Sequence, residues 1–107
     1  MNHPPDFTAD LHYLTTEQGG RKTAAFNGYF PHVKFGFSSY ICGGKQKFIN
    51  KDIVKPGEDV TAEITLLSTI PFKNSLKAGF EFDVMEGSRI VGKGTIIEIL
   101  NQELVAE

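Results

Sequence analysis

The 107-residue sequence predicts an all-β fold, arranged as a closed antiparallel barrel or sandwich of six or seven strands. Three observations predict it. Apolar and polar residues alternate with a period of two over most of the chain, as in strands that bury one face. Turn-forming residues separate these stretches at fairly regular intervals. No stretch shows the 3.6-residue apolar periodicity of a helix, so we expect essentially no helix.

The strands follow from the alternation, starting at the N-terminus. In 7–13 the apolar residues fall on odd positions and the polar ones on even positions. The same pattern predicts strands over 32–38, 60–66 and 80–84, with a weaker strand over 45–50. Residues 89–100 are rich in Ile and Val, which predicts a long strand buried in part on both faces.

Turns are predicted between these strands, and closure of the sheet is expected because it removes exposed edges. Pro56-Gly57 suits a type II turn, since proline presets φ and glycine tolerates positive φ. The other predicted turns are Gly19-Gly20, Gly28, Pro31, Gly43-Gly44, 73–75 and Glu86-Gly87. The expected organisation is an N-terminal extension over 1–5, one β-barrel domain over 6–100 and a short polar tail over 101–107.

Composition favours a soluble cytoplasmic protein. Hydrophobic residues make up 40% and charged residues 22%, and the single cysteine, Cys42, cannot form an intramolecular disulfide. The sequence shows no signal peptide and no apolar stretch of membrane-spanning length. A net charge of −2 argues against a surface that is basic throughout, but it leaves room for a local basic patch.

No catalytic constellation is recognisable, and we expect no enzyme activity, no metal site and no cofactor. Residues 87–93 match the spacing of a phosphate-binding P-loop, but Gly94 replaces the required Ser or Thr, and strand rather than helix is predicted to follow. Asn50-Lys51-Asp52 falls one residue short of a guanine-reading motif, so we expect no bound nucleotide. The three histidines are spread out, and His12 lies on the polar face of a predicted strand.

Three polar loops carry the functional signal. In 19–23 two glycines permit a tight backbone, from which Arg21 and Lys22 are expected to project together. Residues 28–32 form an aromatic loop stiffened by a proline, and 86–89 form a hairpin tip.

These segments, in this order, resemble the C-terminal barrel of elongation factor Tu. The resemblance rests on 19–23, 28–32, 54–59 and 85–94, and it extends from about Asp6 to Leu100. It implies a six-stranded closed antiparallel barrel. In the full factor this barrel helps to hold aminoacyl-tRNA, packs on the GTPase domain and meets the nucleotide-exchange factor.

The resemblance also implies site residues. The family's tRNA-contacting positions fall on Arg21, Lys22, His32, Glu86 and Gly87. Arg21 and Lys22, with Arg89 as a third cation, would neutralise about two or three phosphates, so RNA binding by this barrel is expected to be weak and salt-sensitive.

A second surface is predicted to bind proteins. Tyr29, Phe30 and Pro31 are expected to form part of a docking patch, because a barrel without its partner domains must find another use for its apolar surface. Three functional hypotheses follow: a non-catalytic domain that binds translation components such as tRNA, the exchange factor or the ribosome; a protein-interaction module that mimics the factor without binding RNA; and a small-molecule binder or cryptic enzyme.

Overall fold

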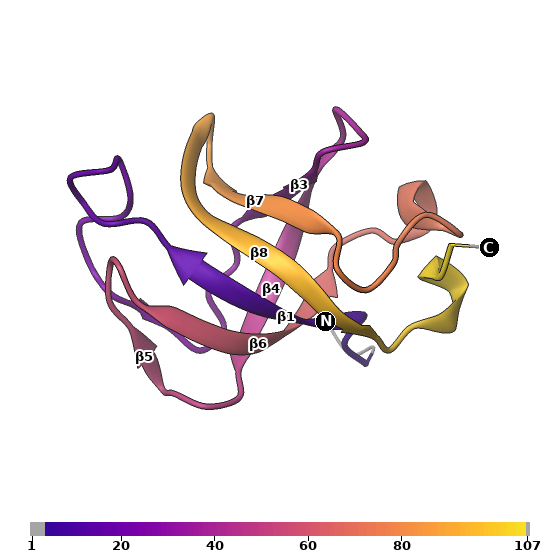
Figure 1. The fold of residues 1–107 in the computed structure, drawn as a ribbon, viewed down its shortest axis with the longest axis horizontal. Coiled ribbons are helices and arrows are strands. Elements are labelled where there is room, and N and C mark those ends of the chain that lie inside the picture. Colours follow the sequence, from indigo (N-terminus) through magenta and orange to yellow (C-terminus); the bar gives the residue numbers. More distant parts are fainter. Residues whose placement is uncertain (1–3, 107) are drawn as a thin grey trace.

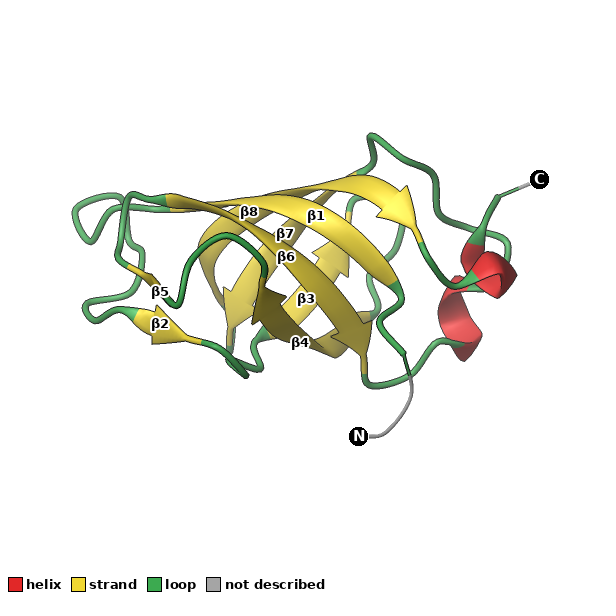
Figure 2. Cartoon of the chain, turned by 90° about the horizontal axis from the view of Figure 1, so that it is seen from below, coloured by secondary structure: helices red, strands yellow, loops and turns green. Residues whose placement is uncertain are grey.

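The structure is a computed structural model that describes residues 4–106. Six strands close into one antiparallel barrel in the order β1-β6-β4-β3-β7-β8, as Figures 1 and 2 show. The barrel strands are β1 (Phe7–Tyr13), β3 (His32–Phe35), β4 (Ile41–Phe48), β6 (Asp59–Leu66), β7 (Glu81–Glu86) and β8 (Arg89–Ile99). The predicted all-β class and the six-stranded closed barrel are confirmed.

Period-two alternation accounts for how the strands are oriented. In β1 the odd residues Phe7, Ala9, Leu11 and Tyr13 are buried, while the even ones face outward. The strand predicted over 32–38 ends earlier than expected, because the chain turns directly after Phe35. The other strong predictions agree with β6, β7 and β8 to within two residues.

The prediction of a turn at Gly43-Gly44 is wrong, since both glycines lie inside β4. A Cβ on Gly43 would come within 2.6 Å of the Phe30 ring, and a Cβ on Gly44 within 2.5 Å of the Val33 side chain. The two glycines are therefore explained by close packing on both faces of a strand rather than by a turn.

Sequence patterning also missed three small elements. A two-stranded ribbon, β2 (Ala25–Phe26) with β5 (Ile53–Val54), lies beside one end of the barrel (Figure 2). Two single-turn 3-10 helices, η1 (Ile70–Phe72) and η2 (Gln102–Leu104), lie near the other end (Figure 1). In the described part of the chain, no helix is long and apolar enough to cross a membrane.

The described part of the expected polar tail, 101–106, is attached to the barrel, whereas Glu107 lies outside the described residues. Leu104 is fully buried, and Val105 forms a parallel bridge with Leu76. Asp6 holds this end in place: its carboxylate accepts hydrogen bonds from the Leu66 amide at 2.7 Å and from the Asn101 side chain at 2.9 Å. One buried leucine thus fixes a segment whose polar composition suggested a free end. Of the expected N-terminal extension, residues 1–3 lie outside the described residues.

Phenylalanine rings fill the centre of the barrel. Phe35 and Phe82 lie 5.4 Å apart between ring centroids, and Phe7 meets Phe82 edge-on at 5.7 Å. Phe82 packs under Gly94 of β8, where a Cβ would come within 2.2–2.7 Å of three ring atoms. The absence of a side chain at this position makes room for the ring.

Substituting Gly94→Ala should therefore destabilise the barrel by about 1–3 kcal/mol, because the ring is held by its neighbours and cannot move away. Gly36→Ala is the matched control, since a Cβ there meets no atom within 4 Å and the backbone is not at positive φ. Urea unfolding followed by circular dichroism would measure both changes. Equal stability of the two variants would contradict the packing argument.

Candidate functional site

A tight loop after β1 begins the candidate site. The Thr15 and Gln18 side chains each bond the other's backbone: Gln18 N–H donates to Thr15 Oγ1 at 3.1 Å, and Thr15 N–H donates to Gln18 Oε1 at 2.9 Å. Gly19 has φ of 98°, and a Cβ on Gly20 would lie 2.3 Å from the Leu14 carbonyl oxygen. Both glycines are thus required to place Arg21 beside the barrel.

The second part of the site is the hairpin between β7 and β8. Glu86 and Arg89 form the last pair of this ladder, and Gly87 has φ of 62° at the first central position of the two-residue turn. That geometry is typical of the tight turns that favour glycine in hairpins. The hairpin tip predicted over 86–89 is confirmed.

The carboxylate of Glu86 joins the two parts. It accepts hydrogen bonds from the Tyr29 hydroxyl and from the Arg21 guanidinium, both to Oε2. The guanidinium also lies over the Tyr29 ring, 4.5 Å from its centroid, in a cation–π contact. Arg89 approaches the other carboxylate oxygen at 3.6 Å. One carboxylate thereby holds Arg21 and Tyr29, which precede Glu86 in the chain by 65 and 57 residues.

These contacts shift the pKa values of Glu86 and Tyr29. Burial alone would raise the pKa of Glu86, but the hydrogen bonds from Tyr29 and Arg21 outweigh it, so the pKa lies below its usual value. Burial and the bond to Glu86 raise the pKa of the Tyr29 hydroxyl. Because the carboxylate is favoured in the folded state, its contribution to stability is present above the unfolded-state pKa and is lost as the pH falls through the folded-state pKa.

The two cations of the loop do not project together, contrary to expectation. Arg21 is turned onto Glu86 and also donates to the Thr23 and Ala24 carbonyls, which leaves 20% of its side chain exposed. Lys22 is exposed and, among the described residues, has no ion-pair or hydrogen-bond partner. The loop therefore presents one free cation, and its arginine serves mainly to fasten the loop.

The remaining predicted RNA-contacting positions are also on this side of the barrel. His32 is exposed at the start of β3, directly opposite Met85 in the ladder and hence one residue from Glu86. Gly87 is exposed at the hairpin tip. Arg21 is thus bonded to Glu86, Lys22 and Gly87 adjoin these two residues in the chain, and His32 adjoins Glu86 in the sheet, although the structure does not test whether any of them binds RNA.

The three residues of the predicted docking patch differ in how exposed they are. The Tyr29 ring is half-buried and its hydroxyl is engaged by Glu86, whereas Pro31 is buried. Only Phe30 is exposed, at 44%. Of the three predicted protein-binding residues, one offers free surface.

A buried polar layer lies beneath this network and was not identified from the sequence. The Tyr13 hydroxyl donates to Gln46 Oε1 at 2.5 Å, and the Tyr13 and Tyr29 rings lie 6.2 Å apart. Gln46 is 1% exposed, and its Nε2 is the one buried side-chain nitrogen or oxygen without a partner in the described residues. The signal was available, because Gln46 and Phe48 share the inward phase of the same strand.

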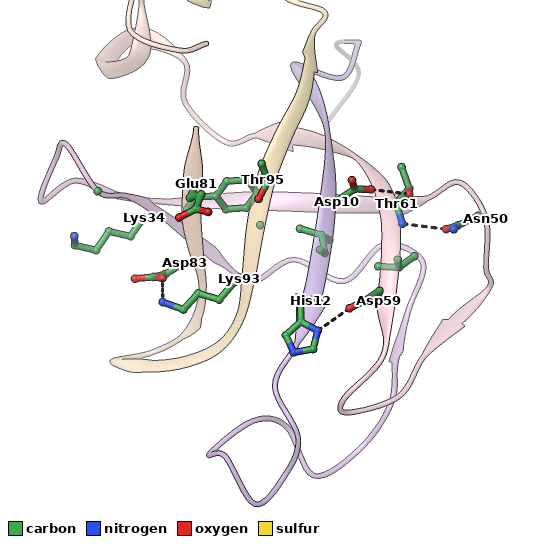
Figure 3. Close-up of a pocket in the computed structure, with 15 residues that line it drawn as sticks. Asp10, His12, Lys34, Asn50, Asp59, Thr61, Glu81, Asp83, Lys93 and Thr95 are labelled. Carbon is green, nitrogen blue, oxygen red and sulfur yellow. Dashed lines mark hydrogen bonds and ion pairs between the residues drawn. The ribbon is translucent and has the colours of Figure 1, made fainter. Parts of the chain in front are cut away.

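A concave region lies on the outer face of the barrel. A groove of about 840 Å³ crosses β6, β1, β8, β7 and β3. Figure 3 shows that His12 and Lys93 turn in opposite directions, to Asp59 at 2.6 Å and to Asp83 at 2.7 Å. Of the three basic residues that line the groove, His12 and Lys93 are thus already paired and Lys34 is not, and the described residues contain no group of three or more potential metal ligands.

Comparison with known families agrees with the fold. The family described as "Elongation factor Tu C-terminal domain" matches residues 2–100 of the chain. The match covers all eight strands and the whole network around Glu86.

A double-mutant cycle would measure the central contact. Arg21→Ala and Glu86→Ala should show a coupling of about 1 kcal/mol in unfolding free energy, because both side chains are mostly shielded and share a hydrogen-bond network. The matched control is Lys93 with Asp83, whose lysine is 57% exposed and whose coupling should be below ~0.5 kcal/mol. Similar couplings for the two pairs would show that the Glu86 network adds no more than an ordinary surface ion pair.

Proposed function

The chain belongs to the family of elongation factor Tu C-terminal domains, and on that premise we propose that it is a non-catalytic domain that contacts tRNA and other translation components. The face that carries the proposal is the one around Glu86, where the loop after β1, the start of β3 and the β7–β8 hairpin meet. The cytoplasm is the compartment that this role requires.

The observation that supports the proposal best is the free cation beside a fixed scaffold. Lys22 is exposed and unpartnered among the described residues, next to an arginine that is locked in place. Arg89 adds a second cation, 52% exposed and only loosely paired with Glu86 at 3.6 Å. Phosphates of a folded RNA need donors in fixed relative positions, and this network supplies that order.

Glu86 limits the strength of such binding. Its carboxylate neutralises the charge of Arg21, so an RNA phosphate must compete with an intramolecular partner. Two available cations give a slope of log K against log salt of about −2, which corresponds to weak binding that disappears at moderate salt. A role as one contact surface within a larger assembly fits such weak affinity.

A protein-interaction role without RNA is the second candidate. The observation that favours it is the exposed apolar surface around Phe30, which a phosphate backbone has no use for. The two candidates are separated by whether binding to tRNA is detectable at low salt.

Titration of labelled bulk tRNA at low and moderate salt, followed by fluorescence anisotropy, tests the proposal. Lys22→Ala should weaken binding at low salt and reduce the salt slope by about 1, since one phosphate contact is lost. Lys77→Ala is the matched control, because Lys77 is also exposed but belongs to the segment before β7, which lies at the other end of the barrel (Figure 1).

The outcome that refutes RNA binding is an unchanged tRNA signal for both variants, or no binding by the wild-type chain at low salt. Either result would leave the protein-interaction role as the better account.

A further inference from the structure

An exposed apolar patch lies on the outer face of β4, next to His32, which pairs with Gly43 in the β3–β4 ladder. Its members are Phe30, Ile41 and Leu67, which are 44%, 43% and 63% exposed. Three large apolar side chains with so much free surface, close together on one face, are characteristic of a binding surface rather than of a solvated exterior.

Gly43 brings the three together. The Phe30 ring lies over this glycine, so that a Cβ there would come within 2.6 Å of the ring. Leu67, the residue directly after β6, bonds to the same glycine, its N–H donating to the Gly43 carbonyl at 2.8 Å. Ile41 lies two residues along β4, and side chains two residues apart share a face. Because Gly43 has no side chain, the Phe30 ring packs directly on β4, and the three apolar side chains form one surface.

The rim of the patch is basic. Lys34 lies directly opposite Ile41 in the β3–β4 ladder, and Lys45 follows Gly43 on the same face. Neither lysine forms an ion pair or a hydrogen bond with the rest of the described chain. The carboxylate in register with Lys34, that of Asp83, is already bound by Lys93 at 2.7 Å.

We propose that this patch docks an acidic amphipathic segment of another protein, with apolar side chains on Phe30, Ile41 and Leu67 and carboxylates on Lys34 and Lys45. Charge complementarity selects the partner, because the two free cations flank the apolar centre. Lys34 lies across the ladder from Ile41, and residues 41 and 45 are four positions, about 13 Å, apart along β4. The two carboxylates of the partner that bind Lys34 and Lys45 are therefore expected to lie about that far apart. The closed barrel offers no strand edge, so the partner binds through side chains, as helices do.

Two other occupants fit the patch less well. Two of its three apolar members are aliphatic, and aliphatic side chains provide no stacking platform for nucleic-acid bases. A second copy of the chain would need an apolar face bearing free carboxylates. Along the groove of Figure 3, Asp59 and Asp83 are occupied by their own cations. Although Glu81 is free there among the described residues, the apolar residues that line the groove, Leu11, Val60 and Phe82, are buried.

The experiment is selection of a displayed library of random peptides, long enough for several helical turns, on the immobilised wild-type chain. The expected peptides combine large apolar residues at helical spacing with Asp or Glu. Synthetic copies should bind about tenfold or more weakly to Leu67→Asp and to the double variant Lys34→Glu/Lys45→Glu. Basic versions of the same peptides should instead prefer the double variant.

Phe26→Asp is the matched control, since Phe26 is 60% exposed but lies on the β2–β5 ribbon. Circular dichroism would verify that each variant is folded. The inference is overturned if no acidic apolar peptide is enriched, or if Phe26→Asp weakens binding as much as Leu67→Asp.

It is also overturned if tRNA binding is lost in Leu67→Asp, or if sedimentation shows a dimer that this substitution dissociates. The inference does not rest on the proposed RNA contact, because Lys22 lies outside the patch. Failure of the peptide selection would leave the tRNA titration with Lys22→Ala unaffected.

Discussion

One carboxylate, that of Glu86, determines the arrangement of the candidate site. It receives the Tyr29 hydroxyl and the Arg21 guanidinium, and so ties the loop after β1 and the loop before β3 to the β7–β8 hairpin. Loops with few apolar contacts are ordinarily the least stable parts of a domain. Here charge-assisted hydrogen bonds and a cation–π contact replace apolar contacts, and they give three separate segments one common geometry.

The barrel beneath makes this arrangement possible. Its six strands close on a core of phenylalanine rings, and glycine occurs where a ring or strand approaches too closely for a side chain. Closure leaves the barrel without a free edge, so recognition must use loops at its ends or side chains on its outer face. The network around Glu86 is of the first kind, and the patch around Gly43 is of the second. Each has its own cations, which makes the two surfaces chemically distinct.

Much of the fold could be predicted from the sequence, because alternation of apolar and polar residues with a period of two indicates which side chains of a strand are buried. The errors arose where the residue type alone did not determine the local structure. Gly43-Gly44 appeared to be a turn, since glycine permits turns and close packing alike. Leu104 fixed a segment of otherwise polar composition. At the site, the positions were predicted from family resemblance, but the pairing of Arg21 and Tyr29 with Glu86 joins residues distant in the chain. No local pattern reveals such a contact.

The central claim is that Glu86 is ionised and held by two donors. A carbon-13 NMR titration of its carboxyl carbon tests this claim most directly. The pKa should lie below the ordinary glutamate value of about 4.3, because the hydrogen bonds from Tyr29 and Arg21 favour the charged form. Tyr29→Phe should raise the pKa towards that ordinary value. An ordinary pKa in the wild-type chain, unchanged in Tyr29→Phe, would contradict the account.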